Sequence, residues 1–262
     1  MYEVLLGILE RANALDYEIV ILPITSKKAF EDENFIANLV RVNDLCALIL
    51  MGIEKHTLYY EELKKINIPT ACIDGDLTSE YVGNVSIDNT AAFLEATDFI
   101  IKNMATNNLQ IHLLFMSGRK NSIACINRQK GFEDAIRKSD KEIISHVYYG
   151  DYSERKSYEI VSMILDQKIK VDAIICANDM MAVGATNAIL EKGFSIPKNV
   201  QVIGCDNVVI GRFLHPSIST ISMNKSDIGF KAVELVHNIM NNTAKQRETI
   251  IAHELLLRET TA

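Results

Sequence analysis

The chain has 262 residues, of which 48% are hydrophobic and 23% charged, a composition typical of a globular protein with one large domain or two smaller ones. The formal net charge of −7 argues against a chain that binds a nucleic-acid backbone by itself, because such binding needs clustered Lys and Arg. No apolar run approaches the roughly 20 residues of a membrane span, and the first residues are acidic and amphipathic, unlike a secretory signal.

The 5 cysteines have no C-x-x-C spacing, so they are expected to be reduced thiols of a cytoplasmic protein.

The first half of the chain alternates between helical spacing of apolar residues and short apolar runs of strand type. In chain order we expect a helix at 2–15, a strand at 18–22, a helix at 30–42, a strand at 47–51, a helix at 58–66, and strands at 70–73 and 82–87. A βαβ chain normally opens with a strand, whereas this one opens with a helix. The first strand of the first sheet is therefore expected to be missing.

The second half continues the same alternation. We expect a helix at 90–102, a strand at 111–116, a helix within 121–138, a strand at 143–149, a helix at 154–166, strands at 173–177 and 200–205 around a helix at 180–192, a strand at 217–221, a helix at 226–241, and strands near 249–251 and 254–257. This pattern predicts an α/β fold with parallel sheets, and the number of strands favours two sheets over one.

The segment 171–207 is the clearest strand–helix–strand unit. Asn178 is a good N-cap, Gly193 is suited to the helix end, and Pro197 keeps the connector extended. Two strands joined by one helix form a parallel pair, so both end at the same sheet edge. Since ligands of open parallel sheets bind beyond the carboxyl ends of strands, function is expected at this edge.

Several motifs together resemble the effector-binding domain of the LacI/GalR (lactose/galactose repressor) family. ANDMMAVGA and GFSIPKNVQVIGCDN are similar to the family's strand-to-helix segment and its G-x-x-x-P-x-x-V-x-V-x-G-x-D pattern. Other matching segments, in chain order, are VSIDN, NRQKGFEDAI, YYGDYSERKSYE, HPSISTI and LLLRETT. The resemblance covers essentially the whole chain, in the family's order and spacing.

This resemblance implies two Rossmann-like lobes of the periplasmic-binding-protein-like type I fold, joined by three crossings. The first lobe would comprise residues 1–117 and 224–250, and the second 118–223 and 251–262. The family's helix-turn-helix domain, hinge helix and first strand have no counterpart here; a truncated chain or a wrongly assigned start is the expected reason. The turn before the fifth strand is replaced by 105–109, expected to be a surface change.

Asp206 and Arg128 are the strongest candidate ligand contacts. The carboxylate of Asp206 can accept hydrogen bonds from two adjacent ligand hydroxyls. The alternative is that Asp206 is only a turn or cap residue. The planar guanidinium of Arg128 can donate two hydrogen bonds to hydroxyls, a carboxylate or a phosphate of a ligand. The alternative is that Arg128 only forms a salt bridge at the surface. Replacing either residue with Ala is expected to abolish ligand binding and leave the fold intact. Asn178 is either a contact or simply an N-cap, whereas Asp179 is expected to be structural.

Four further residues are weaker candidates. Tyr152 follows a strand end and could stack on a sugar or base with its hydroxyl in water. Asp88 stands at the corresponding edge of the first lobe, with an N-cap as its alternative. Ser122 and Asp74 are loop residues, which are mostly solvated.

The resemblance implies an effector sensor: the ligand-binding and dimerising core of a cytoplasmic transcriptional regulator. A small polar metabolite, expected to be a sugar, would bind between the lobes, and DNA would be bound only through a separate N-terminal domain. The alternative is a solute-binding receptor of a sugar transporter. An enzyme is disfavoured, since no catalytic or phosphate-binding motif is present and the histidines lack metal-ligand spacing. No cofactor or metal is expected.

Overall fold

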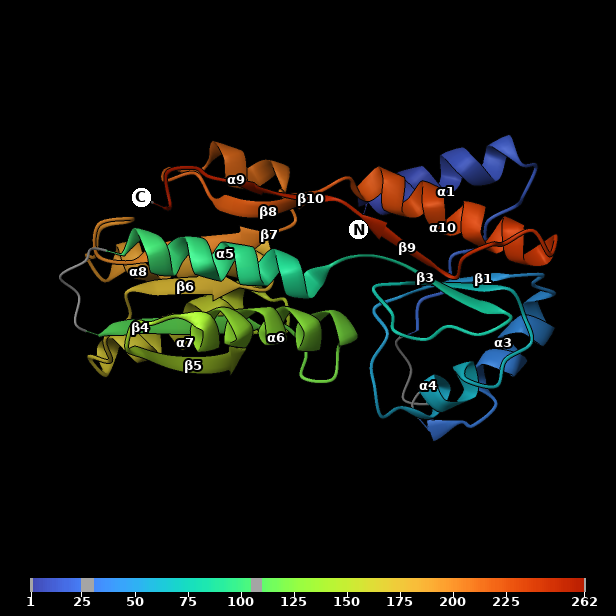
Figure 1. The fold of residues 1–262 in the computed structure, drawn as a ribbon, viewed down its shortest axis with the longest axis horizontal. Coiled ribbons are helices and arrows are strands. Elements are labelled where there is room, and N and C mark those ends of the chain that lie inside the picture. The colour runs from blue at the N-terminus through green and yellow to red at the C-terminus, as the bar shows by residue number, and fades with distance from the viewer. Residues whose placement is uncertain (1, 25–30, 105–109, 262) are drawn as a thin grey trace. The chain divides into compact units, whose positions relative to one another are not determined.

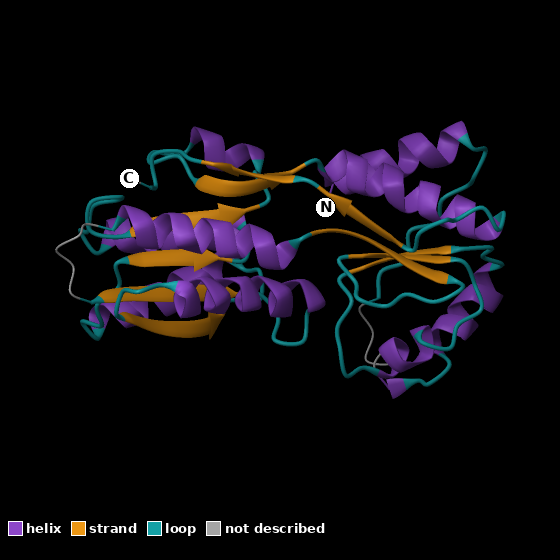
Figure 2. Ribbon diagram, in the orientation of Figure 1, coloured by secondary structure: helices purple, strands orange, loops and turns teal. Residues whose placement is uncertain are grey.

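The computed structural model describes residues 2–24, 31–104 and 110–261, in which helices alternate with strands (Figures 1 and 2). The predicted α/β class with mainly parallel sheets is confirmed. The chain divides into two compact units. Unit 1 comprises Met1–Ile87, Asn121–Ala124 and Asn224–Ala252, and unit 2 comprises Asp88–Lys120, Cys125–Met223 and His253–Ala262.

Unit 1 contains a four-stranded parallel sheet in the order β1-β2-β3-β9. Its strands are β1 (Leu48–Met51), β2 (Thr70–Ile73), β3 (Val82–Ile87) and β9 (Glu248–Ile251). The helices among its described residues are α1 (Tyr2–Ala14), α3 (Phe35–Asn43), α4 (Leu58–Leu63) and α10 (Lys225–Met240). Helices α3 and α4 cover one face of this sheet and α10 the other, with α1 packed on α10 (Figure 1).

Two glycines allow α1 and α10 to pack closely. A Cβ atom at Gly229 of α10 would lie 2.0 Å from the carbonyl oxygen of Val4, and one at Gly7 of α1 would lie 1.9 Å from that of Ser226. Both distances are far below van der Waals contact. Each helix therefore depends on a glycine where it crosses the other.

Unit 2 contains a six-stranded sheet in the order β10-β8-β7-β6-β4-β5, in which only β10 runs antiparallel to its neighbour. Its strands are β4 (Ile111–Ser117), β5 (Ile143–Tyr149), β6 (Ala173–Cys176), β7 (Gln201–Cys205), β8 (Ser219–Met223) and β10 (His253–Leu256). Its helices are α5 (Asn89–Asn103), α6 (Ile123–Lys138), α7 (Glu154–Asp166), α8 (Asp179–Glu191) and α9 (Val209–Phe213).

Strand β4 shows how helices cover both faces of this sheet. Phe115 stacks on Phe132 of α6 and meets Phe93 of α5 edge-on. The next residue, Met116, lies on the side of Met181 in α8, since both sulfur atoms are close to Gly150. Successive strand residues point to opposite faces, so α5 and α6 cover one face and α8 the other.

The strand expected at 18–22 is absent: residues 17–24 have no regular secondary structure, and Val20 and Ile21 are exposed. A strand needs a hydrogen-bonded neighbour, and in the described part of the chain none pairs with this segment. The helix expected at 30–42 begins at Phe35, and the helix expected at 58–66 ends at Leu63. Residue 30 and the segment 105–109 lie outside the described residues.

The division into units also differs from the expected lobes 1–117 plus 224–250 and 118–223 plus 251–262. Residues 88–117, which form α5 and β4, belong to unit 2 because β4 is hydrogen-bonded between β5 and β6. Residues 121–124 and 251–252 belong to unit 1. The chain therefore passes from unit 1 to unit 2 at the start of α5, earlier than expected.

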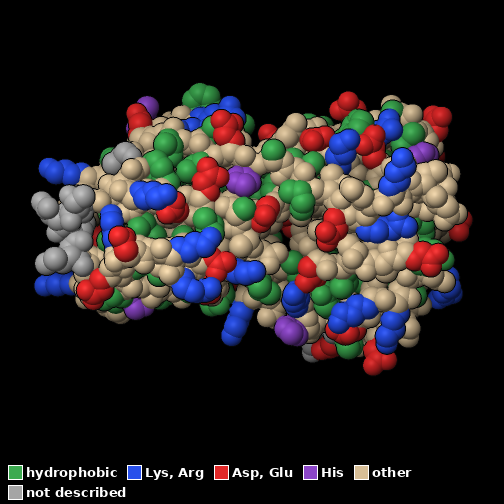
Figure 3. Space-filling view, viewed as in Figure 1, with side chains coloured by type: hydrophobic (Ala, Val, Ile, Leu, Met, Phe, Trp, Pro, Cys, Tyr) green, Lys and Arg blue, Asp and Glu red, His purple; other side chains and the backbone are tan. Residues whose placement is uncertain are grey.

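The surface carries mixed charge. On the face shown in Figure 3, acidic and basic side chains are interspersed, in keeping with the net charge of −7. Within the described ranges, no helix combines the length and the apolar character that crossing a membrane requires.

Candidate functional site

The carboxyl ends of the parallel strands of unit 2 meet at one edge of the sheet, called here the carboxyl edge. Strands β4 to β7 run in the same direction, as their arrowheads in Figure 2 show. Tyr152 follows the end of β5, Asn178 follows β6 and Asp206 follows β7. The structure therefore brings these three predicted residues to one edge, because neighbouring parallel strands end side by side.

Arg128 joins three elements near this edge. It lies in α6 and is only 5% exposed, so the alternative of a surface salt bridge is wrong. Its Nε donates to Asn89 Oδ1 (2.7 Å) at the start of α5, and its Nη1 donates to the carbonyl oxygen of Ala177, just beyond β6. The guanidinium also lies over the Phe93 ring, 5.6 Å from its centroid. Arg128 thus ties two helices to the end of β6.

Asn178 and Asp88 both act as N-caps. Asn178 Oδ1 accepts from the Met181 backbone N–H (2.9 Å) at the start of α8. Asp88 Oδ1 accepts from the Ala91 backbone N–H (2.9 Å) at the start of α5. The N-cap expected at Asn178 and the N-cap given as the alternative at Asp88 are both confirmed. A cap uses one side-chain oxygen, so contact with a ligand at these residues stays a prediction.

Tyr152 differs from its prediction in one respect. Its hydroxyl was expected in water, whereas it lies 2.8 Å from Sγ of the buried Cys125. The same sulfur accepts from the backbone N–H of Gly118 (3.2 Å), the residue that follows β4. The aromatic ring is therefore held at the carboxyl edge by its own hydroxyl. Cys125 was not predicted, since a single cysteine in a helix gives no signal of this contact.

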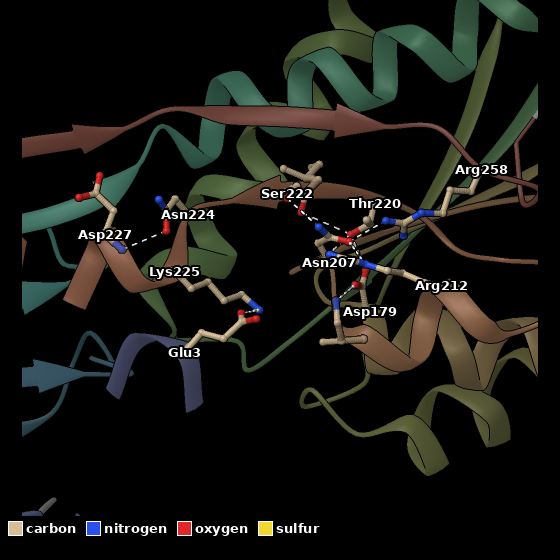
Figure 4. A network of polar contacts seen from close by, with 12 residues as sticks. Glu3, Asp179, Asn207, Arg212, Thr220, Ser222, Asn224, Lys225, Asp227 and Arg258 are labelled. Carbon is tan, nitrogen blue, oxygen red and sulfur yellow. Dashed lines mark hydrogen bonds and ion pairs between the residues drawn. The ribbon is translucent and has the colours of Figure 1, made fainter. Parts of the chain in front are cut away.

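Asp206 and the residue after it form a turn with unusual backbone angles. The φ angles of Asp206 and Asn207 are 115° and 51°, and the backbone N–H of Asp206 donates to the carbonyl oxygen of Ile221 (2.9 Å). Asn207 Oδ1 accepts from Arg258 Nη2 (2.6 Å) and from Arg212 Nε (3.3 Å) (Figure 4). Burial and the neighbouring Arg212 lower the pKa of Arg258. The sequence pointed to Asp206 and not to this network.

Asp74 and Ser122 belong to unit 1, whereas the other five candidates belong to unit 2. Asp74 follows β2 with φ of 54°, and its backbone N–H donates to the carbonyl oxygen of Val85 (3.1 Å). Ser122 is buried and forms an isolated antiparallel bridge with Glu54. Both residues stay predictions as ligand contacts.

A polar cluster in unit 1 was not predicted. The Tyr60 hydroxyl donates to Asp76 Oδ1 (2.9 Å), and Lys55 Nζ lies 2.6 Å from Asp76 Oδ2. Burial and Asp76 raise the pKa of Tyr60 to about 12, and burial raises the pKa of Cys72 to about 12. The sequence singled out Asp74 and not Asp76, which lies two residues later. The contacts of Asp76 with Tyr60 and Lys55 are made only in the folded chain, so no local pattern indicated them.

The described residues include no group of three or more His, Cys, Asp or Glu side chains that could hold a metal ion. The polar groups at the carboxyl edge are hydrogen-bond donors and acceptors beside an aromatic ring. Such a set suits a small polar ligand.

The fold and this edge define the class of protein. A family model described as a periplasmic binding protein-like domain matches residues 110–261, more than half of the chain. The HTH-type transcriptional repressor PurR of Histophilus somni is 29% identical over 195 residues, covering 74% of this chain and 57% of the relative. The HTH-type transcriptional regulator RegA of Clostridium saccharobutylicum is 24% identical over 262 residues, covering 99% of this chain and 77% of the relative.

A solved structure shows the same fold over the full length. It is that of a periplasmic binding protein/LacI transcriptional regulator from Alkaliphilus metalliredigens complexed with D-xylulofuranose, with 25% identity, a TM-score of 0.80, and coverage of 100% of this chain and 94% of that one. The chain is a periplasmic binding protein-like domain and belongs to the LacI/GalR family, as its motifs predicted. It spans little more than half the length of the PurR relative.

Proposed function

We propose that the chain is the effector-sensing and dimerisation domain of a cytoplasmic transcriptional regulator. A small polar metabolite, most simply a sugar, binds at the carboxyl edge of unit 2. Its binding changes the DNA affinity of a separate helix-turn-helix domain. The relatives' names support the regulator, and the D-xylulofuranose complex of a family member supports a sugar.

One observation carries the proposal: polar and aromatic side chains follow the ends of three parallel strands of one sheet, beside a buried arginine. In the proposed complex Asp206 accepts from adjacent ligand hydroxyls, and the Tyr152 ring packs on the apolar face of the sugar. Asn178, Asp88 and Arg128 complete the polar lining. The short hydrogen bonds of Arg128 and Tyr152 hold this lining in place before the ligand arrives.

The proposed switch needs only a modest free energy. If one conformation of the domain binds the metabolite about 100-fold more tightly than the other, the coupling is about 2.7 kcal/mol, within the usual range for allosteric proteins. In a dimer, such a change alters how two DNA-binding domains are placed on a symmetric operator.

The proposal is tested by thermal unfolding of the purified chain with four probes: D-xylulose, cellobiose, glucose 6-phosphate and adenosine. A compound at 100 times its Kd adds about 2.7 kcal/mol to the free energy of unfolding. For a chain of this size we therefore expect a rise in Tm of about 5–10 °C with at least one probe. Light scattering of the same samples tests for the dimer.

The matched variants are Asp206→Asn and Asp166→Asn. Asn tolerates positive φ, so the first variant removes the charge and preserves the turn. Asp166 is an exposed residue at the end of α7 that pairs with Lys192. We expect Asp206→Asn to lose the Tm shift and Asp166→Asn to keep it. A Tm that no probe changes, or an equal response of both variants, would contradict the proposed site.

A further inference from the structure

Asp179 is a buried carboxylate that binds the turn after β7. It is the first residue of α8 and is 1% exposed. Its Oδ2 accepts from the backbone N–H of Val208 (2.8 Å), and its Oδ1 accepts from the Thr220 hydroxyl (2.6 Å) (Figure 4). A buried carboxylate is tolerated only when hydrogen bonds replace its water, and these two bonds do so.

Thr220 extends this contact to a second amide of the turn. Its hydroxyl is buried on β8, donates to Asp179, and accepts from the backbone N–H of Asn207 (3.2 Å). The consecutive amides of Asn207 and Val208 are thus both bound to Asp179, the first through Thr220 and the second directly. Figure 4 shows these side chains converging on the turn from α8 and β8.

The turn needs such support because of its backbone angles. Asp206 and Asn207 are consecutive non-glycine residues with positive φ, a conformation that persists only where the surroundings hold it. The side chain of Asn207 adds a further bond, from its Nδ2 to the Ser222 hydroxyl (3.0 Å). Asp206 is the residue of this turn that is predicted to contact the ligand. Its position therefore depends on the hydrogen bonds of the two residues that follow it.

Strand β7 is shaped to accept the carboxylate of Asp179. A Cβ atom at Gly204 would lie 2.1 Å from Asp179 Oδ1, so a larger residue there would displace the carboxylate. Gly204 lies two residues before Asp206. The position of the carboxylate and the absence of a side chain at Gly204 depend on one another.

We propose that Asp179 is a positioning residue for the effector site, acting with Thr220 to hold the turn 206–208 and so to set the position of the Asp206 carboxylate. This inference rests on the proposed function, in which Asp206 contacts the metabolite. Asp179 itself acts through the turn. The role predicts that the loss of one buried hydroxyl, at Thr220, changes the surroundings of Asp206.

The test compares three threonine variants. Thr220→Val removes the hydroxyl and nearly preserves the volume, and Thr220→Ser restores a hydroxyl. Thr186→Val is the matched control, because Thr186 lies in α8, is 2% exposed, and its hydroxyl has no hydrogen-bond partner among the residues that the structure describes. Asp179→Asn is a second variant of the same contact and is measured alongside Thr220→Val.

Two NMR measurements need no ligand. In Thr220→Val we expect the amides of Asn207 and Val208 to exchange with solvent at least tenfold faster, and the carboxyl ¹³C shift of Asp206 to change. Thr220→Ser and Thr186→Val should give wild-type values. Wild-type exchange and a wild-type Asp206 shift in both Thr220→Val and Asp179→Asn would overturn the inference.

Calorimetric titration with D-xylulose, cellobiose, glucose 6-phosphate and adenosine separates positioning from a purely structural role. For each probe that binds the wild-type chain, we expect Thr220→Val to weaken binding at least tenfold and Thr220→Ser to restore it. Faster exchange with unchanged affinity would overturn the positioning role. If no probe binds the wild-type chain, the proposed function loses its support, while the Asp206 shift still decides whether Asp179 and Thr220 position that carboxylate.

Discussion

Replacing Arg128 with Met tests whether this buried guanidinium supports the carboxyl edge. The Met side chain still packs against Phe93, but the Asn89 side-chain oxygen and the Ala177 carbonyl oxygen, on residues 4% and 0% exposed, lose the hydrogen bonds that Arg128 donates. A hydrogen bond to a charged group contributes about 1.5–3 kcal/mol, so the loss of two costs about 3–6 kcal/mol. Removing a buried charge offsets part of this cost. We expect unit 2 to lose about 3 kcal/mol.

The assay is urea unfolding followed by circular dichroism, with Arg137→Met as the control. Arg137 lies in the same helix, its side chain is 72% exposed, and it pairs with Asp134 one turn away. Exposed pairs of this kind contribute less than about 1 kcal/mol, so the control should unfold close to the wild type. Equal unfolding midpoints for the two variants would refute the reasoning. The predicted loss of stability differs from the expectation, drawn from the sequence alone, that replacing Arg128 leaves the fold intact.

Two further predictions concern unit 1. Gly229→Ala places a Cβ atom 2.0 Å from the Val4 carbonyl oxygen and forces α1 away from α10, so we expect a loss of about 1–3 kcal/mol in thermal unfolding; an unchanged Tm would contradict the close crossing. Burial raises the pKa of Cys72 from 9.0 to about 12, so the unfolded chain ionises first and stability present below pH 9.0 is lost as the pH rises toward about 12. This shift corresponds to about 4 kcal/mol, and Cys72→Ala should flatten the alkaline fall in unfolding free energy; an unchanged slope would exclude the thiol as its cause.

Local signals made the strand–helix–strand unit 171–207 predictable. The structure gives β6 at Ala173–Cys176, α8 at Asp179–Glu191 and β7 at Gln201–Cys205, close to the expected ranges. The N-cap and the helix end depend on neighbours in sequence, so they can be recognised there. Residues 18–22 have the same apolar character as a strand, yet they form none, because a strand exists only with a partner.

In the candidate site, too, some features could be predicted from the sequence and others only from the tertiary structure. The sequence by itself determined that polar residues follow the ends of parallel strands, since strand direction follows from the βαβ order and parallel strands end at one edge. Only the tertiary structure decided what each side chain touches. Arg128 reaches Ala177 across 49 positions of sequence, Tyr152 reaches Cys125 across 27, and Asp179 reaches Thr220 across 41. Contacts over such separations depend on how helices pack on a sheet, and this packing leaves no local pattern in the chain.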